Sequence, residues 1–347
     1  EPRINGVSMM YLALNRSKKS LAVNYLSAKG KQVIFDMIKN ADVLVEQFRP
    51  GVMKKLGFGY EELSAINPKL IYVSITGYGQ HSSKAMDAGH DLNYIAIAGA
   101  LGITGTEDEI VIPGFQLGDI AGGSYMAMNA VTTALYQREK TGKGEWIDVA
   151  MTDAAVPFAA LQFANYQATK ENINRGEFEL SGALANYNVY KCKDGKFVAL
   201  GSLEPKFWNK FCTRVNRQDW SELFLLKGEQ LDTLKAEVKE LFLAKTRQEW
   251  LLYFKEDDIC FTTINSISEM ETDAYLNERK MFLENEHPSV GKYRTINQPL
   301  KFKQTNFDNN WAAPDLGHDS VNILLSLNYS ESEIAELIKK AIIKSKT

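Results

Sequence analysis

Histidine and cysteine are both scarce in this sequence. Of its 347 residues, 4 are histidines and 3 are cysteines. The odd number and irregular spacing of the cysteines exclude a disulfide-stapled scaffold and a cysteine-rich metal module. We therefore expect unpaired thiols in a reducing compartment, and no metal site.

Long apolar runs and a dominant sign of charge are missing as well. No stretch reaches the roughly 20 apolar residues that a membrane-spanning helix needs, and no signal-peptide pattern is present. The net charge is −3 and the pI is near 6.0. We expect a protein that binds neither nucleic acid nor membrane. We expect it to be cytoplasmic, or peroxisomal or mitochondrial if its source is eukaryotic.

The first 150 residues alternate between strand-like and helix-like patterns. Hydrophobic residues make up 45% of the chain and charged residues 24%, which suffices for a buried core. Predicted strands lie at 43–45, 70–75 and 146–150, and predicted helices follow Ser27 and cover 60–66 and 119–138. Because strand–loop–helix–strand units are typical of α/β proteins, we predict an α/β fold here.

The second half has a different texture. Asp194-Gly195 between two strand-like runs predicts a hairpin, and Pro205 suits the first turn of a helix. Ser330 and Glu333 form a capping-box pattern before a final amphipathic helix. We predict five parts: a large domain at 1–150, a linker at 151–187, a small α+β domain at 188–274, a return linker at 275–292 and a C-terminal segment at 293–347.

The most distinctive stretch runs from residue 88 to residue 123. His90 stands in a Gly-His-Asp triplet, and Asp119 stands between glycines where a long helical pattern begins. A histidine and a carboxylate at the mouths of two elements are suited to proton transfer. Plainer interpretations stay open: Asp119 also fits a helix N-cap, and His90 an ordinary surface or core histidine. Glu204 stands at another loop–helix junction and fits an exposed helix start.

A series of motifs in fixed order resembles the class III CoA-transferase superfamily of CaiB/BaiF type. Within it, the G-H-D-L-N-Y and L-E-P-K-F segments are most similar to the α-methylacyl-CoA racemases. The shared motifs are N-R-S-K-K-S-L at 15–21, A-D-V-L-V-E-Q-F-R-P-G-V at 41–52, L-I-Y-V-S-I-T-G-Y-G-Q at 70–80, A-G-H-D-L-N-Y at 88–94, L-G-D-I-A-G-G at 117–123 and T-G-K-G at 141–144.

The resemblance implies a Rossmann-like large domain, a smaller α+β domain, and two chains interlocked like links in a homodimer. The C-terminal segment would rejoin the large domain. Each active site would lie between the large domain of one chain and the small domain of the other. His90 and Asp119 would be the two catalytic bases, with Glu204 supporting His90 and Asp91 supporting Asp119.

The resemblance also implies an acyl-CoA thioester as the ligand, with no cofactor beyond that CoA. Expected CoA contacts are Arg16, Lys19, Val23, Asn24, Tyr25, Leu26, Gln47, Phe48, Arg49, Lys55, Gly89, Leu92, Asn93 and Tyr94. On sequence alone, the basic loop at 15–20 also fits a solvated turn.

Family members begin with a strand and a helix upstream of the position of Glu1. The large domain is therefore expected to lack that unit, unless the sequence is a partial record.

Three functions follow as alternatives. The first is a racemase that inverts the α-carbon of 2-methylacyl-CoA thioesters by proton transfer through an enolate. The second is a CoA-transferase that moves CoA between carboxylic acids through an aspartyl anhydride. The third is a non-catalytic CoA-binding or assembly protein, which the intact Asp119 disfavours. His90, as a second base, favours the first.

Overall fold

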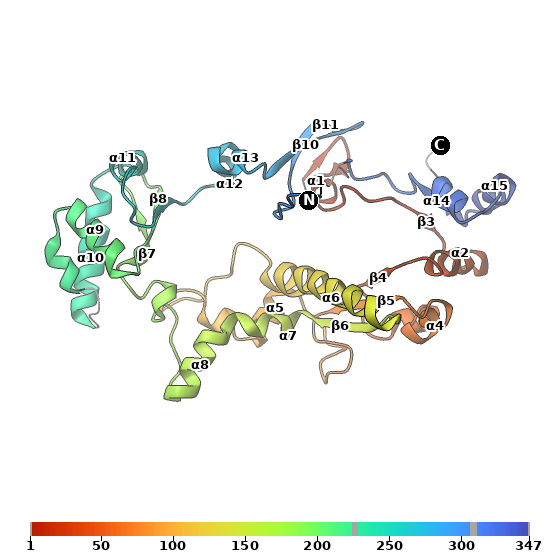
Figure 1. Ribbon diagram of the computed structural model, residues 1–347, viewed down its shortest axis with the longest axis horizontal. Helices are drawn as coiled ribbons and strands as arrows, with labels where there is room; N and C mark the ends of the chain where they lie inside the picture. The colour runs from red at the N-terminus through yellow and green to blue at the C-terminus, as the bar shows by residue number, and fades with distance from the viewer. Residues whose placement is uncertain (1, 224–227, 306–310, 346–347) are drawn as a thin grey trace.

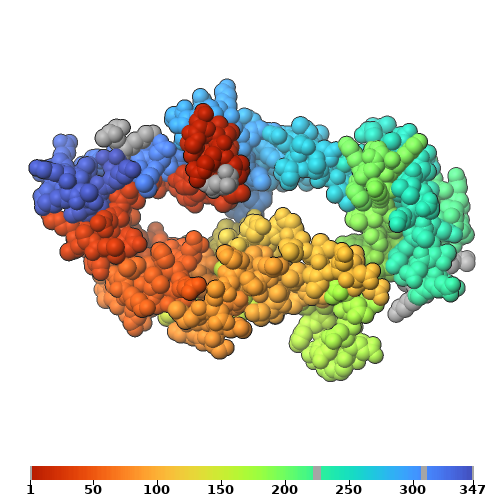
Figure 2. All heavy atoms as spheres, turned by 180° about the vertical axis from the view of Figure 1, so that it is seen from behind, coloured from red at the N-terminus to blue at the C-terminus, as the bar shows by residue number. Residues whose placement is uncertain are grey.

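The chain forms a ring around a central opening. The computed structural model describes residues 2–223, 228–305 and 311–345. Figure 1 shows a sheet with its helices along one side of the ring and the small domain at one end, with the chain returning along the other side. The opening remains when all atoms are drawn (Figure 2). Within the described part of the chain, no helix has the length and apolar character needed to span a membrane.

The central sheet has three parallel strands in the order β4–β5–β6. Its strands and the helices around it are β4 (Val43–Glu46), β5 (Ile71–Thr76), β6 (Trp146–Ala150), α2 (Ala28–Ile38), α3 (Val52–Leu56), α4 (Tyr60–Ile66), α5 (Asp91–Ile97) and α6 (Met126–Thr141). The predicted strands, and the predicted helix at 60–66, are confirmed. The α/β fold class is confirmed with them.

Each face of this sheet is packed by different helices. On one face, Ile71 and Val73 pack against Ala127 and Ala134 of α6, whose small side chains let the helix approach closely. On the other face, Tyr72 joins a cluster beneath α2 and α4. Ser27 caps α2, as predicted, by accepting a hydrogen bond from the Gly30 N–H at 3.0 Å.

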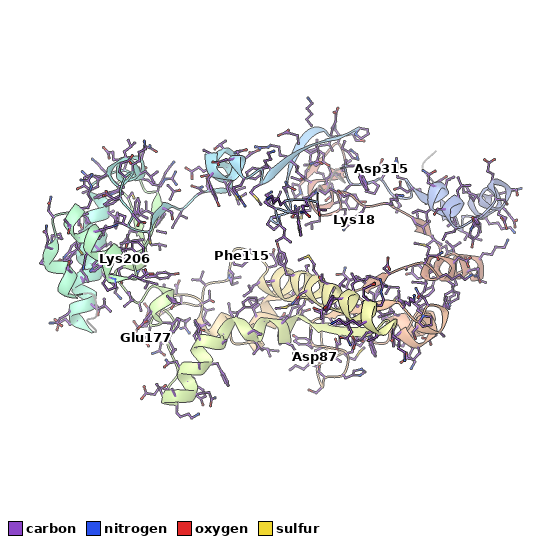
Figure 3. All side chains as sticks on the ribbon, viewed as in Figure 1. Lys18, Asp87, Phe115, Glu177, Lys206 and Asp315 are labelled. Atoms are coloured by element: carbon purple, nitrogen blue, oxygen red, sulfur yellow. The ribbon has the colours of Figure 1, made fainter. Side chains whose placement is uncertain are left out.

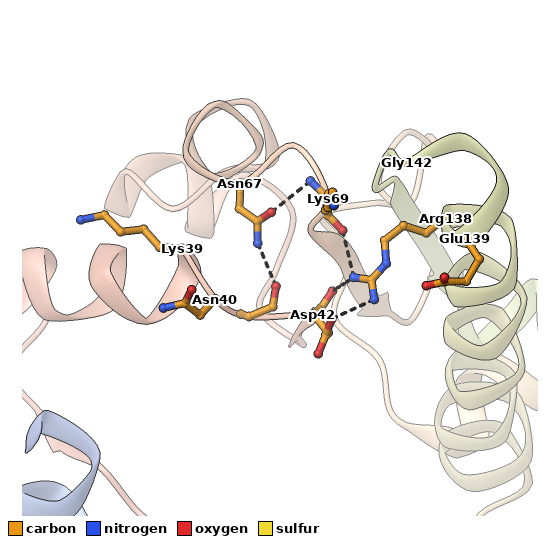
Figure 4. A pocket seen from close by; sticks show the side chains of 9 residues that line it. Lys39, Asn40, Asp42, Asn67, Lys69, Arg138, Glu139 and Gly142 are labelled. Carbon is orange, nitrogen blue, oxygen red and sulfur yellow. Dashed lines mark hydrogen bonds and ion pairs between the residues drawn. The ribbon is translucent and has the colours of Figure 1, made fainter. Parts of the chain in front are cut away.

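Arg138 of α6 closes the end of the sheet where strands β4 and β5 begin. Its guanidinium donates to Asp42 Oδ1 at 2.8 Å and to the Lys69 carbonyl at 3.2 Å, in a polar pocket of about 400 Å³ (Figure 4). Asn67 donates to two carbonyls of the α2–β4 connection in the same pocket. These contacts tie loops together at the edge of the sheet where the strands start.

The two ends of the described chain are built into other segments. β1 (Arg3–Ile4), β2 (Val7–Ser8) and α1 (Met9–Leu14) lie against the hairpin of β10 (Phe282–His287) and β11 (Gly291–Ile296), with Leu12 and Tyr293 in one cluster. The C-terminal part contains α14 (Ser320–Ser326), α15 (Glu331–Lys339) and β12 (Ile343–Lys344). β12 pairs with β3 (Ala22–Val23) beside α2. The capping box at Ser330 and Glu333 is confirmed.

The small domain is an antiparallel sheet covered by helices. It contains β7 (Tyr187–Lys191), β8 (Phe197–Gly201), β9 (Phe261–Thr263), α9 (Pro205–Arg214), a 3-10 helix (Gln218–Leu223), α10 (Glu229–Leu243) and α11 (Arg247–Tyr253). The Asp194-Gly195 hairpin and the place of Pro205 in the first turn of α9 are confirmed. Trp208, Trp220 and Trp250 lie fully buried in its core.

Short elements connect the domains. They are α7 (Met151–Ala155), a 3-10 helix (Val156–Ala159), α8 (Ala160–Thr169), a 3-10 helix (Glu179–Ser181), α12 (Ile267–Thr272) and α13 (Ala274–Glu278). The hairpin of β10 and β11 crosses the predicted boundary at residue 292. The exact division into domains stays a prediction.

Candidate active site

A cavity of about 810 Å³ opens where strands β4 and β5 end. In open α/β sheets ligands bind at the carboxyl ends of the strands, because the loops there converge. Both His90 and Asp119 line it. The other lining residues are Leu14, Gln47, Phe48, Arg49, Pro50, Ile75, Thr76, Gly77, Tyr78, Ala85, Asp87, Ala88, Gly89, Asn93, Tyr94, Gln116, Ile120, Ser124 and Met151.

His90 is the residue that precedes α5, and its neighbours fix its backbone. Its N–H donates to Asn93 Oδ1 at 3.1 Å, and the Tyr94 hydroxyl donates to the Gly89 carbonyl at 2.6 Å. A Cβ on Gly89 would lie 2.7 Å from the Tyr78 hydroxyl oxygen and 2.7 Å from the Tyr94 ring. Glycine is therefore required at position 89, and the aromatic pair holds the Gly-His-Asp turn against the cavity wall.

Asp119 lies in the first turn of a π-helix, Leu117–Tyr125, that leads into α6. The residue that caps this helix is Gln116, so the interpretation of Asp119 as an N-cap is wrong, as is the predicted helix start at residue 119. π-Helical segments are rare, and those within α-helices occur often at functional sites. A Cβ on Gly122 would come 2.9 Å from the Met151 carbonyl, which explains the glycine there.

Asp91 connects the two helix starts. Its Oδ1 accepts the backbone N–H of Asp119 at 2.8 Å, which anchors the π-helix on α5. Partial burial of the Asp119 carboxyl raises its pKa, the negative charge of Asp91 raises it further, and His90 acts in the opposite direction. A carboxyl group with a raised pKa is a better proton donor near neutral pH, and such shifts are typical of catalytic positions.

Glu204 is not among the residues that line this cavity. It is the N-cap of α9 in the small domain, and its side chain is exposed. Figure 3 labels Lys206, two residues further on, at the far end of the ring from the sheet. Within one chain, Glu204 and His90 are not brought together, so a supporting role for Glu204 stays a prediction.

The expected CoA contacts divide into two groups. Those that line the cavity are Gln47, Phe48, Arg49, Gly89, Asn93 and Tyr94, and those outside its lining are Arg16, Lys19, Val23, Asn24, Tyr25, Leu26, Lys55 and Leu92. In the second group, Val23 pairs with Ile343, and the Tyr25 ring packs edge-on against Phe58 with centroids 6.3 Å apart.

Sequence reasoning did not include the loop after β5 in the site. Thr76, Gly77 and Tyr78 line the cavity, and a Cβ on Gly77 would lie 2.3 Å from the Tyr94 ring. The signal was present, since a glycine-bearing loop leaves the end of a buried strand. Met151 and Leu14 come from distant parts of the sequence, and no local pattern points to them.

Comparisons with known proteins match most of the chain. Residues 1–320 match CoA-transferase family III. The α-methylacyl-CoA racemase of Homo sapiens is 30% identical over 344 residues, which cover 96% of this chain and 86% of that protein. The succinyl-CoA:glutarate CoA-transferase of Mus musculus is 30% identical over 350 residues, which cover 99% of this chain and 80% of that protein. The crystal structure of a CAIB/BAIF family protein from Brucella suis superposes with a TM-score of 0.80 at 26% identity, covering 94% of this chain and 86% of that one.

Proposed function

This chain belongs to CoA-transferase family III, whose members act on acyl-CoA thioesters, and on that premise we propose that it is a racemase. It inverts the α-carbon of 2-methylacyl-CoA thioesters. The observation that carries the proposal is the presence of His90 and Asp119 on the wall of one cavity. A racemase needs two proton-transfer groups, one for each face of the α-carbon, and these two side chains meet that need.

The reaction is a balanced 1,1-proton transfer. One group removes the α-proton, the carbonyl oxygen of the thioester takes up the charge as an enolate, and the other group returns a proton to the opposite face. Backbone N–H groups at a helix start stabilise such an oxyanion. The Asp119 N–H already donates to Asp91, so the donors are other N–H groups of that turn.

The second substrate wall is proposed to come from another copy of the chain. In a homodimer that places the small domain of one chain over the cavity of the other, Glu204 of the second copy reaches His90. A carboxylate hydrogen-bonded to an imidazole fixes its tautomer and favours its charged form. Support comes from the exposed position of Glu204 at the start of α9, where its carboxylate is available to a partner.

A CoA-transferase is the second candidate, favoured by the similarity to the succinyl-CoA:glutarate enzyme. The Asp119 carboxylate would attack the thioester carbonyl and expel CoA thiolate, which gives a mixed anhydride. The thiolate would then attack the aspartyl carbon, releasing the free acid and leaving an aspartyl-CoA thioester. This route needs Asp119 but gives His90 no role.

Exchange in deuterated water separates the two. A racemase incorporates α-deuterium into a 2-methylacyl-CoA without any acceptor acid, as followed by NMR. His90→Ala and Asp119→Asn should each slow racemisation by about 10²-fold or more, as expected when a positioned acid or base is lost. For a transferase, His90→Ala has little effect, and hydroxylamine traps an acyl group on Asp119. CoA transfer to a free acid without α-deuterium would overturn the racemase proposal.

A further inference from the structure

The loop at 110–115 directly precedes the cavity-lining residue Gln116, and the proposed chemistry does not use it. We propose that this loop is the binding surface for the acyl chain, and that the chain it takes is apolar and carries no second carboxylate. The inference rests on the proposed function and narrows its substrate class. We define the acyl surface as Ile110, Val111, Ile112 and Phe115, with Ile120 beyond them.

Exposure of the acyl surface is the first observation. Ile110, Val111, Ile112 and Phe115 are 53%, 48%, 64% and 63% exposed. Single exposed apolar residues are common, but a contiguous group in one short loop marks a surface that is covered by a ligand or a partner. Figure 3 labels Phe115 on a loop that rises from the sheet side of the ring toward the central opening.

The turn that precedes the acyl surface, and the first two residues of the surface, are held in a defined position. A bridge between Gly105 and Ile110 closes this turn, and the Val111 N–H donates to the Thr104 carbonyl at 3.2 Å. From the linker to the small domain, the Arg175 guanidinium donates to the Thr106 carbonyl at 3.0 Å and to the Glu107 carbonyl at 2.9 Å. A surface fixed before binding costs less ordering entropy when the ligand arrives. This loop is therefore suited to recognition.

Continuity with the reacting groups is the third observation. Gln116 directly follows Phe115 and lines the cavity, and Asp119 and Ile120 line it too. Ile120 is 46% exposed, so the apolar surface reaches the residue next to the Asp119 carboxylate. The α-carbon of the substrate has to lie at Asp119. The rest of its acyl chain then has an apolar path over Ile120 toward Phe115.

Acidic side chains outnumber basic ones along this path, which disfavours a dicarboxylic acyl group. Arg175, the arginine beside this turn, is engaged with two backbone carbonyls. Glu107, Asp108 and Glu109 precede the loop, and the cavity wall adds Asp87 and Asp119. Among the described residues that line the cavity, Arg49 is the one lysine or arginine, and it comes from the loop after β4, where CoA is expected. A carboxylate moved out of water without a cationic partner carries a large cost.

Binding affinity tests the inference without depending on the reaction. Calorimetry with straight-chain acyl-CoAs from butanoyl to decanoyl should show roughly twofold to fourfold tighter binding per added methylene. In an Ile112→Ser/Phe115→Ser double variant, affinity should become almost independent of chain length. The matched control is Ile267→Ser on α12, whose isoleucine is 79% exposed outside the acyl surface, and which should leave the dependence unchanged.

The second part of this binding experiment tests the effect of a charge on the acyl chain. Pentanoyl-CoA and glutaryl-CoA have the same chain length, and the glutaryl ester should bind about tenfold or more weakly because its carboxylate faces acidic residues. Ile112→Arg should reduce this difference in affinity between the two esters. Equal affinity for the two esters, or no dependence on chain length, overturns the inference. So does a double variant that keeps the chain-length dependence and instead loses self-association. Failure of α-deuterium exchange with every 2-methylacyl-CoA would overturn the racemase proposal separately.

Discussion

Opposing electrostatic effects act on the carboxyl group of Asp119. Its carboxyl is partly withdrawn from water and faces the negative charge of Asp91, and both effects raise its pKa, while His90 lowers it. The same Asp91 accepts the Asp119 N–H, so the contact that positions the backbone also disfavours the ionised side chain. The position of the Asp119 backbone is thus fixed at a cost in stability, because the same contact disfavours the charged carboxylate.

The pH dependence of stability should show this conflict. Because the pKa of Asp119 is raised in the folded state, the folded protein holds the proton more tightly than the unfolded chain. Stability is therefore lost as pH rises from the ordinary aspartate pKa through the raised one. At the low end of that pH window, the melting temperature of Asp119→Asn should equal that of the wild type. At neutral pH, the melting temperature of the variant should be the higher of the two.

Thermal melts between about pH 4 and pH 7 measure this difference. Asp119→Glu keeps the charge and serves as the matched variant, whose melting temperature should follow that of the wild type with pH. If Asp119→Asn instead becomes steadily less stable than the wild type as pH rises, Asp119 is stabilised by ionisation, and the assigned direction of its pKa shift is wrong.

At the scale of single residues, much of the candidate site could be predicted from the sequence. His90 and Asp119 stood out because a rare residue and a glycine-flanked carboxylate each preceded a helical pattern, and both line the cavity. The cap at Gln116 was missed because the segment Leu117–Tyr125 contains three glycines and few apolar side chains, so its periodicity does not show where the helix begins. Contacts such as Met151 against Gly122 depend on tertiary packing, which local periodicity does not contain.

Among the elements, the turn at 104–111 connects the active site with the linker to the small domain. Its backbone bonds, Thr106 N–H to the Glu109 carbonyl at 2.9 Å and Val111 N–H to the Thr104 carbonyl at 3.2 Å, make it a small hairpin. Arg175 fixes its tip from outside. The acyl surface thus depends on a residue that touches no reacting atom, and Arg175 is a positioning residue.

Replacing Arg175 should weaken acyl-CoA binding more than it slows the bound substrate. Arg175→Ala loses two charge-assisted hydrogen bonds, and we expect KM for long-chain esters to rise about tenfold with a smaller change in kcat. Lysine cannot span two carbonyls as the planar guanidinium does, so Arg175→Lys should fall between alanine and wild type. Steady-state kinetics over a series of chain lengths measures the effect.

The control for this variant lies on the same linker. The Lys170 ammonium donates to the Gln167 side chain at 2.9 Å and lies over the Tyr166 ring, both on α8, so Lys170→Ala should leave KM unchanged. A merely structural role for Arg175 predicts a different pattern. In that case short and long esters lose activity equally, and kcat falls with the amount of folded protein.

Element prediction succeeded where the pattern was long and failed where it was short. Strands β4, β5 and β6 were found because buried parallel strands are continuous apolar runs. The hairpin of β10 and β11 was taken for a linker, since its exposed residues interrupt the alternation and its contacts are with α1, nearly three hundred residues earlier. Pairing over that distance leaves no local trace.

On the scale of the whole molecule, the open ring explains the exposed apolar surface. Apart from the acyl surface, which the substrate would cover, large apolar side chains are exposed on the connecting helix α8 at Phe163 and on the sheet of the small domain at Val189. A lone chain with a hole through it leaves these surfaces in water, at a cost in free energy proportional to the apolar area. A second copy that passes through the opening would cover them and bring Glu204 to His90 (Figure 2).

Interlocked rings differ from ordinary dimers in how they come apart. An ordinary interface dissociates on dilution, whereas linked chains separate only if one of them unfolds, because a closed path must open. We therefore expect light scattering to give twice the 39.0 kDa of one chain, with no monomer on dilution to nanomolar concentration. Separately purified tagged and untagged proteins, mixed under native conditions, should form no mixed dimer over days.

Refolding of the mixed proteins is the positive control for this experiment. If the same two proteins are mixed in urea and then diluted together, about half of the dimers should carry one tagged and one untagged chain, because random pairing gives 1:2:1. Mixed dimers would be counted by pull-down and mass. Subunit exchange within minutes under native conditions would show an ordinary dimer, and a stable monomer at micromolar concentration would sink the interlocked arrangement. A stable monomer would also remove Glu204 as the partner of His90, because the two residues are not brought together within one chain.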